Sequence, residues 1–224
     1  MTSAPTKVAI FQHMETEAPG SITDILGSRG VPWEIHRLDE TGEVPAVIRS
    51  PLIILGGGMS VHDGKEYPFI AGEKEIIRRY IGDQRPVIGI CLGAQLIASA
   101  AGSRVYPGPP ESGWCTIRRE TPGYFRELPD RMTVFQFHGD TFDLPAGAVL
   151  LWRGTEVRHQ MFLLGSAAAV QFHPEITIPL IEAWGRDLDP GALHELVARS
   201  PRFIPPSHAF CEELVDRFLI GRTG

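Results

Sequence analysis

The chain has 224 residues, of which 43% are hydrophobic and 21% charged, and its formal net charge at pH 7 is −6. This length and composition are typical of one large or two small globular domains with a substantial core. The negative charge and the lack of a Lys/Arg cluster argue against a nucleic-acid or membrane surface, and no apolar run approaches the roughly 18 residues of a membrane span.

The amino-terminal sequence and the cysteines bear on the compartment in which the protein works. The segment MTSAPTKVAIFQHMETEAPG has a short apolar run without a basic region or a small-residue cleavage site, so it predicts a first strand rather than a signal peptide. The three cysteines, Cys91, Cys115 and Cys211, are odd in number and widely spaced. This pattern fits a reducing compartment better than a disulfide framework, and we expect a cytoplasmic protein.

The first half of the chain alternates short apolar runs with helical patterns. The expected strands are residues 7–11, 33–38, 52–55 and 86–90, and the expected helices are 21–29, 69–81 and an alanine-rich segment directly after the fourth strand. Ser21 is the expected N-cap of the first helix, and Gly30 is its expected C-terminal stop. This βαβ order predicts an α/β fold with an open, mostly parallel sheet and helices on both faces.

The second half changes rhythm. Strand-like runs occupy residues 114–118, 132–137, 148–152, 160–164 and 167–172, and helical patterns return at 178–184, 191–198 and 207–220. The closely spaced strands predict a smaller antiparallel or mixed sheet appended to the parallel one. Residues 185–206 are rich in Pro, Gly and charge, so we expect a surface insertion within a single domain that covers residues 1–224.

The stretch GICLGAQ places Cys91 at the carboxyl end of a predicted parallel strand, where the active residues of open α/β sheets gather. Gly89 and Gly93 permit a tight strand-to-helix turn like the G-x-S-x-G nucleophile elbow, with sulfur in place of the hydroxyl. Free N–H groups at the helix start favour a thiolate there. A small buried cysteine that fills a gap would account for this segment equally well.

The stretch QFHPE supplies a histidine with a carboxylate two positions later. Pro174 keeps the chain extended, so His173 and Glu175 project to the same side. Glu175 could then orient the imidazole while its other nitrogen faces Cys91, as nucleophilic catalysis by cysteine requires. The structural alternative is that His173 ends a strand and Glu175 begins a helix.

An acyl-transfer site also needs hydrogen-bond donors for the developing oxyanion. The backbone N–H of Leu92 follows the cysteine directly, and the glycines of LGGGMS follow a strand that should neighbour the strand of Cys91. This glycine run lacks the spacing of a phosphate-binding loop. Taken alone, it is most often a flexible turn.

Taken together, GICLGAQ, LGGGMS, FHGD and QFHPE resemble the class I glutamine amidotransferases, most closely the stand-alone GMP-synthase-like group, over about residues 7–184. The resemblance implies that Cys91 attacks the side-chain amide of L-glutamine to form a γ-glutamyl thioester, that His173 acts as base and then as acid, and that Glu175 orients His173. It implies an oxyanion hole at Gly57 or Gly58 and Leu92. It implies a glutamine pocket at Gln95, His138, Gly139 and Asp140, and no cofactor.

The chain departs from the family pattern in two places. Phe137 precedes His138 where many amidotransferases have serine, so a role for that serine side chain is not transferred. Family enzymes usually deliver ammonia to a synthetase domain or subunit, and no such domain is recognisable after residue 218. We therefore expect a separate synthetase as the acceptor.

Other functions remain open at this point. The same chemistry would serve an independent hydrolase of γ-glutamyl compounds, because the motifs do not distinguish an amide from a γ-glutamyl peptide bond. A non-catalytic binding or regulatory protein on the same scaffold is a third reading. A metal hydrolase is disfavoured, since the spacing of His138, Asp140, His173 and Glu175 matches no H-E-x-x-H signature and leaves the cysteine turn unexplained.

Overall fold

A mixed nine-stranded sheet forms the centre of the structure, a computed structural model that describes residues 7–221. Residues 1–6 and 222–224 of the expected domain lie outside the described residues. The strands are β1 (Val8–Gln12), β2 (Trp33–Arg37), β3 (Leu52–Ile54), β4 (Val87–Ile90), β5 (Val105–Arg119), β6 (Arg131–Phe142), β7 (Val149–Arg153), β8 (His159–Leu164) and β9 (Ala167–Val170). Their order across the sheet is β2-β1-β3-β4-β9-β8-β7-β5-β6.

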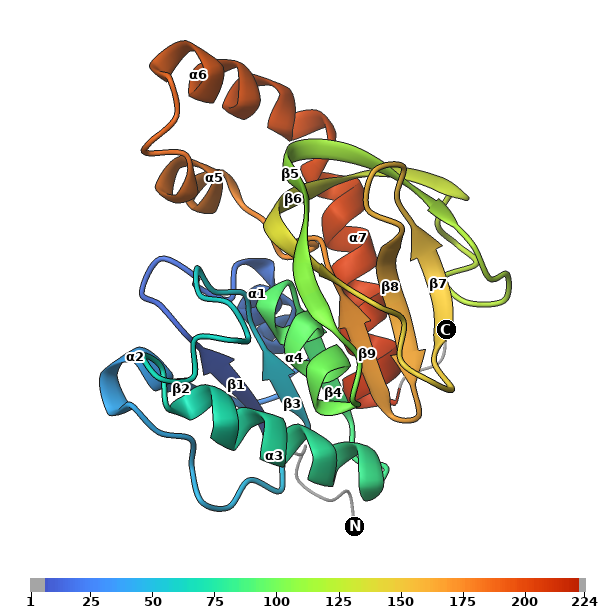
Figure 1. The fold of residues 1–224 in the computed structure, drawn as a ribbon. Coiled ribbons are helices and arrows are strands. Elements are labelled where there is room, and N and C mark those ends of the chain that lie inside the picture. Colours follow the sequence, from blue (N-terminus) through green and yellow to red (C-terminus); the bar gives the residue numbers. More distant parts are fainter. Residues whose placement is uncertain (1–6, 222–224) are drawn as a thin grey trace.

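Helices cover both faces of this sheet (Figure 1). They are α1 (Ser21–Ser28), α2 (Leu38–Thr41), α3 (Phe69–Gly82), α4 (Leu92–Ala100), α5 (Ile178–Trp184), α6 (Pro190–Arg199) and α7 (Ile204–Val215), with a 3-10 turn at Ser200–Arg202 and a π-helical turn at Asp216–Ile220. The apolar sides of α1 and α7 share one core with the sheet, and those of α3 and α4 form a second core on the opposite face. None of the described helices is long and apolar enough to cross a membrane.

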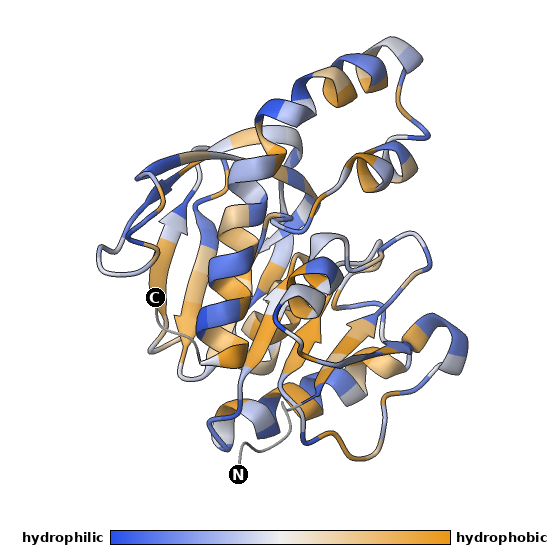
Figure 2. Ribbon diagram, turned by 180° about the vertical axis from the view of Figure 1, so that it is seen from behind, coloured by the Kyte–Doolittle hydropathy of each residue, from blue (hydrophilic) through white to orange (hydrophobic). Residues whose placement is uncertain are grey.

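The parallel strands are the most apolar part of the molecule. Every residue of β1, β3, β4 and β9 is buried, which is expected of strands with helices on both sides. Figure 2 shows this as a band of hydrophobic strands behind helices with one polar and one apolar side. Such packing holds the carboxyl ends of β1, β3 and β4 rigidly side by side, and the loops that follow them carry the candidate site.

The predicted α/β fold with an open, mostly parallel sheet is confirmed. The strands β2, β1, β3, β4 and β9 pair in parallel. The antiparallel strands continue this same sheet, because β8 pairs with the free edge of β9 and β7, β5 and β6 follow outward. The two parts of the predicted sheet are therefore joined edge to edge.

Two helix starts differ from the sequence prediction. Gly20, not Ser21, is the N-cap of α1, at φ 53°. A Cβ at Gly20 would lie 2.2 Å from the carbonyl oxygen of Glu175, so the close approach of that chain selects glycine. The last helix begins at Ile204, before the predicted residue 207, because proline is tolerated in the first helical turn, where N–H groups have no intrahelical acceptor. Gly30 does follow the end of α1, with φ 65°.

Residues 185–206, the predicted insertion, contain α6 and the 3-10 turn. Figure 1 shows α5 and α6 projecting beyond the sheet, and α6 contains no buried residue. Its partly buried apolar side chains, Leu193, Leu196 and Val197, pack with residues of α5 in a small third cluster. The assignment of this segment as an insertion stays a prediction.

Candidate active site

Cys91 occupies a sharp turn between β4 and α4. Its backbone has φ 52° and ψ −105°, in a region that non-glycine residues seldom adopt. The two flanking glycines allow the helix to lie directly on the strands: a Cβ on Gly93 would be 2.2 Å from the carbonyl oxygen of Ile54, and a Cβ on Gly89 would be 2.4 Å from backbone atoms of Gly93. The spacing of GICLG is thus required by backbone contact, and the turn lifts the thiol above the sheet.

His173 and Glu175 lie just beyond β9, the strand beside β4. The Nδ1 atom of His173 is 2.8 Å from Oε1 of Glu175, and each residue is 2% exposed. The backbone N–H of His173 donates to the carbonyl of Phe135 at 2.9 Å, which fixes the backbone from which the imidazole projects. Because the carboxylate accepts from Nδ1–H, Nε2 is the nitrogen left to face Cys91.

The charges around His173 favour its protonated form. Burial lowers the pKa of His173, but the carboxylate of Glu175 and the sulfur of Cys91, each by charge and hydrogen bonding, raise this pKa well above its ordinary 6.5. The Oε2 atom of Glu175 is buried and has no hydrogen-bond partner in the described part of the chain. Glu175 interacts with His173 alone, and its charge helps to keep the imidazole protonated.

The glycine loop after β3 approaches the cysteine turn from the other side. A Cβ on Gly56 would lie 3.6 Å from Cβ of Cys91, and a Cβ on Gly57 would lie 2.8 Å from Cδ2 of Leu92. The N–H of Gly58 donates to the sulfur of Met14 at 3.4 Å. Gly57 therefore packs against the Leu92 side chain, while the N–H of Gly58 is already used by Met14.

A buried ion pair supports this glycine loop from below. Nδ1 of His13 is 2.7 Å from the carbonyl oxygen of Gly56, and Nε2 is 3.0 Å from Oε1 of Glu73. Both side chains are 0% exposed. Burial lowers the pKa of His13, but the charge of Glu73 and hydrogen bonds to Glu73 and Gly56 outweigh this and raise the pKa. The His13–Glu73 contact thus clamps the loop to α3, and the raised pKa favours the charged form of His13.

We expect the clamp to make stability depend on pH. Because the folded-state pKa of His13 is raised, its contribution is complete below the unfolded value near 6.5 and is lost as the pH rises through the folded value. Replacing His13 with alanine should destabilise the fold by about 3–5 kcal/mol, since Glu73 would remain buried and unpaired. Denaturant unfolding at several pH values measures both effects. His62→Ala is a control that removes a histidine outside the clamp, and an equal stability loss in both variants would contradict the assignment.

One pocket of about 540 Å³ collects most of the predicted site residues. Those that line it are Gly57, Gly58, Cys91, Gln95, His138, Gly139, Asp140 and His173. Leu92 and Glu175 do not line it; both are buried, Leu92 directly after Cys91 and Glu175 in contact with His173. All predicted site residues thus converge on one place in the fold.

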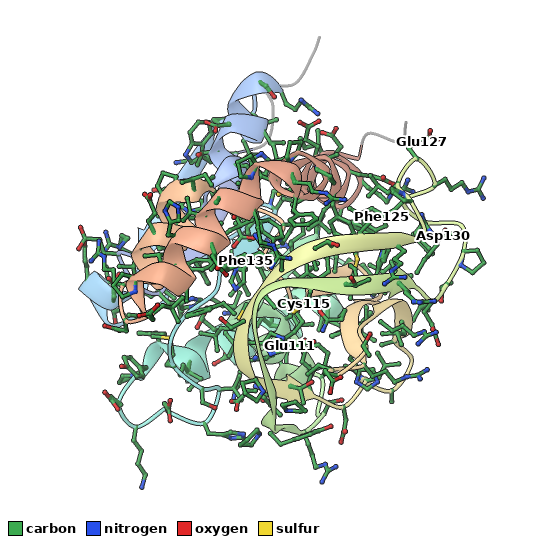
Figure 3. All side chains as sticks on the ribbon, turned by 90° about the horizontal axis from the view of Figure 1, so that it is seen from above. Glu111, Cys115, Phe125, Glu127, Asp130 and Phe135 are labelled. Atoms are coloured by element: carbon green, nitrogen blue, oxygen red, sulfur yellow. The ribbon has the colours of Figure 1, made fainter. Side chains whose placement is uncertain are left out.

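Hydrogen bonds hold the predicted glutamine-binding segment in place. Nε2 of Gln95 donates to the carbonyl of Asp140 at 3.2 Å, and Nδ1 of His138 lies 3.1 Å from the same oxygen. The other ring nitrogen of His138 is 3.2 Å from Oε2 of Glu111, which lies on β5 and, with Cys115, is labelled along the long β5–β6 ribbon in Figure 3. The Ser60 hydroxyl donates to Oδ2 of Asp140 at 2.8 Å. This wall of the pocket is therefore pre-organised.

Several residues of the site were missed in the sequence. Glu17, Ser60, Asp63 and Glu111 also line the pocket. Trp184 meets the ring of His173 edge-on at a centroid distance of 4.6 Å and stacks on Phe137 at 5.9 Å. Glu17 could have been predicted from its position, because it follows the first parallel strand. The carboxyl end of that strand points to the same edge of the sheet as that of β4.

The His, Cys, Asp and Glu side chains around the pocket do not form a metal-binding site within residues 7–221. Among residues 7–221, no group of three or more His, Cys, Asp or Glu side chains is arranged to hold a metal ion. The histidines instead pair singly with carboxylates, as His138 does with Glu111 and His173 with Glu175.

Comparisons with known proteins identify the family. The sequence model of the glutamine amidotransferase class-I family matches residues 17–180. The glutamine-hydrolyzing GMP synthase of Bacillus subtilis is 34% identical over 161 residues, which are 69% of this chain and 30% of that protein. The chain spans about a quarter to a third of the length of the curated relatives it matches.

Solved structures are similar over nearly the whole chain. A glutamine amidotransferase from Thermotoga maritima superposes with a TM-score of 0.87 at 29% identity, covering 96% of this chain and 98% of that one. A glutamine amidotransferase from Methylobacillus flagellatus gives 0.82 at 27% identity, covering 99% and 97%. The extent of the family match, together with the strand-end pocket around Cys91, shows that the chain belongs to the class-I glutamine amidotransferase family.

Proposed function

We propose that the protein hydrolyses the side-chain amide of L-glutamine through a thioester on Cys91. The observation that carries this proposal is the alignment of Cys91, His173 and Glu175 at one pocket, with a 2.8 Å contact between the last two. Family membership supports the reaction class, because glutamine amidotransferases release ammonia from glutamine. The roles of the individual residues are our inference.

The proposed first half-reaction forms the thioester. The Cys91 thiolate attacks the amide carbon, and the N–H groups of Gly57 and Leu92 donate to the oxygen that becomes negative. His173 then gives its Nε2 proton to the leaving nitrogen, the C–N bond breaks, and ammonia departs. Glu175 stabilises the imidazolium throughout and holds the tautomer that points Nε2 at the reaction.

The second half-reaction consumes water. His173, now neutral, accepts a proton from a water molecule whose oxygen attacks the thioester, and the collapse of the tetrahedral intermediate returns Cys91 and releases glutamate. Gln95, His138, Gly139 and Asp140 also line the pocket and would hold the glutamyl group. Their mutual hydrogen bonds keep this wall fixed between cycles.

We further propose that the ammonia passes to a separate synthetase in the cytoplasm. The curated relatives named as glutamine-hydrolyzing GMP synthases are more than three times as long as the matching region, which supports a synthetase component outside it. The three free cysteines fit a reducing compartment.

A second candidate function is hydrolysis of γ-glutamyl compounds larger than glutamine. A pocket of about 540 Å³ lies within the range that encloses drug-sized ligands, so it has room for a leaving amine larger than ammonia. The chemistry at Cys91 would be unchanged.

Covalent labelling tests the assignment of the nucleophile. A chloroketone analogue of glutamine should add to Cys91 and not to the other two cysteines, as mapped by peptide mass spectrometry. Burial raises the pKa of the Cys115 thiol, and complete burial raises that of Cys211 further, so neither forms a thiolate readily. Glutamine should protect Cys91. Labelling of Cys115 alone would contradict the proposal, and a lack of both labelling and turnover would favour the non-catalytic reading.

A further inference from the structure

The position of the leaving group follows from the proposed chemistry on which this inference depends. His173 gives a proton to the departing nitrogen, so the departing amine must lie against the His173 imidazole. Whatever is attached to that nitrogen extends toward the part of the pocket beside His173. The groups that line this part therefore decide which leaving amines are accepted.

The carboxylate of Glu17 lies in that part of the pocket. A Cβ on Gly56 would be 3.0 Å from Cε1 of His173 and 3.1 Å from Oε2 of Glu17, so both atoms flank the same small volume. Glu17 also lines the pocket together with Cys91 and His173. It comes from the loop between β1 and α1.

The backbone around Glu17 is held in place. Its N–H donates to the carbonyl of Met14 at 3.1 Å, and the indole N–H of Trp184 donates to the carbonyl of Thr16 at 2.9 Å. Trp184 itself packs against His173. The carboxylate thus has a defined place relative to the imidazole.

The carboxylate of Glu17 has no partner of its own. Among residues 7–221, no group forms a hydrogen bond or ion pair with it. Burial raises its pKa, while the charges of His173 and His13 act in the opposite direction. By contrast, Asp63 accepts from the N–H of Ser60, and Glu111 accepts from the amide of Gln160. A half-buried carboxylate without a donor is completed by a ligand that brings positive charge.

The remainder of the pocket favours the same kind of ligand. Its lining includes the further carboxylates of Asp63, Glu111 and Asp140, and within residues 7–221 it includes no lysine or arginine. A leaving amine that carried a carboxylate would meet like charge from these side chains and find no lysine or arginine to pair with. One that carried an ammonium group would find Glu17.

We propose that Glu17 is a specificity residue that selects γ-glutamyl compounds whose leaving amine carries a second, positively charged nitrogen, as in the γ-glutamyl amides of diamines. Cys91 forms the thioester, the amide C–N bond breaks, and His173 protonates the released nitrogen. The distal ammonium stays bound to the Glu17 carboxylate until the diamine leaves. Water then releases glutamate.

Three γ-glutamyl amides with leaving groups of similar length and different charge test this inference: γ-glutamylputrescine (cationic), γ-glutamylpentylamide (neutral) and γ-glutamyl-γ-aminobutyrate (anionic). The measured quantity is kcat/KM for glutamate release. The protein should prefer the cationic amide over the neutral one, and the neutral one over the anionic one, by on the order of 10-fold at each step.

The variant Glu17→Gln should reduce both ratios to near unity, because the amide keeps the shape of the side chain and removes the charge. Glu15→Gln, at an exposed position on the same loop, is the matched control and should keep the wild-type ratios. If Glu17→Gln does not fold, Glu17→Asp should keep the order of preference. A flat ranking in the wild-type protein, no hydrolysis of any of the three amides, or an unchanged ranking in Glu17→Gln would overturn the inference.

The outcomes separate this inference from the proposed function. If Glu17 acted only by stabilising the His173 imidazolium, Glu17→Gln would slow all three amides equally, and the specificity role would be wrong. If Cys91 is labelled and glutamine is hydrolysed while the ranking is flat, only the Glu17 inference fails. If Cys91→Ala hydrolyses the amides as fast as the wild type, the proposed function itself fails.

Discussion

Replacing Cys91 with alanine should lower kcat for glutamine hydrolysis by on the order of 10⁴-fold or more. Without sulfur no thioester forms, and the remaining site offers only the oxyanion donors and a misplaced base for direct attack by water. The measurement is ammonia release under saturating glutamine. The fold should persist, because alanine keeps the Cβ and the loss of one small sulfur from a buried position removes little packing.

Cys115→Ala is the matched control for this experiment. It removes a thiol from β5 that lies outside the pocket lining, and turnover should remain at the wild-type level. Thermal unfolding of both variants checks that the comparison is between folded proteins. If the Cys91 variant released ammonia at the wild-type rate, a group other than Cys91 would be the nucleophile.

Glu175→Gln should reduce kcat/KM by on the order of 10³-fold to 10⁴-fold and also change the pH profile. Glu175 is the largest of the influences that raise the pKa of His173, so neutralising it should lower that pKa. The imidazolium is the form that donates a proton to the leaving nitrogen, and it disappears as the pH rises through the His173 pKa. The alkaline limb of the profile should therefore move to lower pH in the variant.

A carboxylate elsewhere near the site provides the control. Glu182→Gln changes an exposed side chain on α5 and should leave both the rate and the alkaline limb in place. A Glu175 variant that is slow but keeps the wild-type pH profile would mean that this carboxylate orients the ring without setting its charge.

Much of the catalytic centre is predictable because it lies where buried parallel strands end. Strands such as β1, β3 and β4 are continuous apolar runs, so their bounds differ from the predicted ones by one residue. The residues after them, including Cys91 between its glycines, are then placed by topology alone. His173 was identifiable for the same reason, since it follows β9 beside β4.

The parts that were not predicted depend on contacts between distant segments. The sequence YPGPPESG resembles a turn, yet it lies inside β5, because a register shift between Pro107 and Glu111 lets the ladder with β6 continue past the prolines. Glu17 and Trp184 reach the site only once α1, α5 and β9 are packed together. Their sequence neighbourhoods carry no motif that specifies the partner.

The left-handed backbone at Cys91 lowers the stability of the fold, while the proposed activity needs the cysteine there. A non-glycine residue in such a conformation costs on the order of 1–3 kcal/mol, and here the surrounding helix and strands impose it. Selection for thermal stability alone would favour glycine at this position, because glycine adopts the conformation without strain. A related protein that no longer needed the reaction could therefore replace Cys91 with glycine and become more stable but inactive.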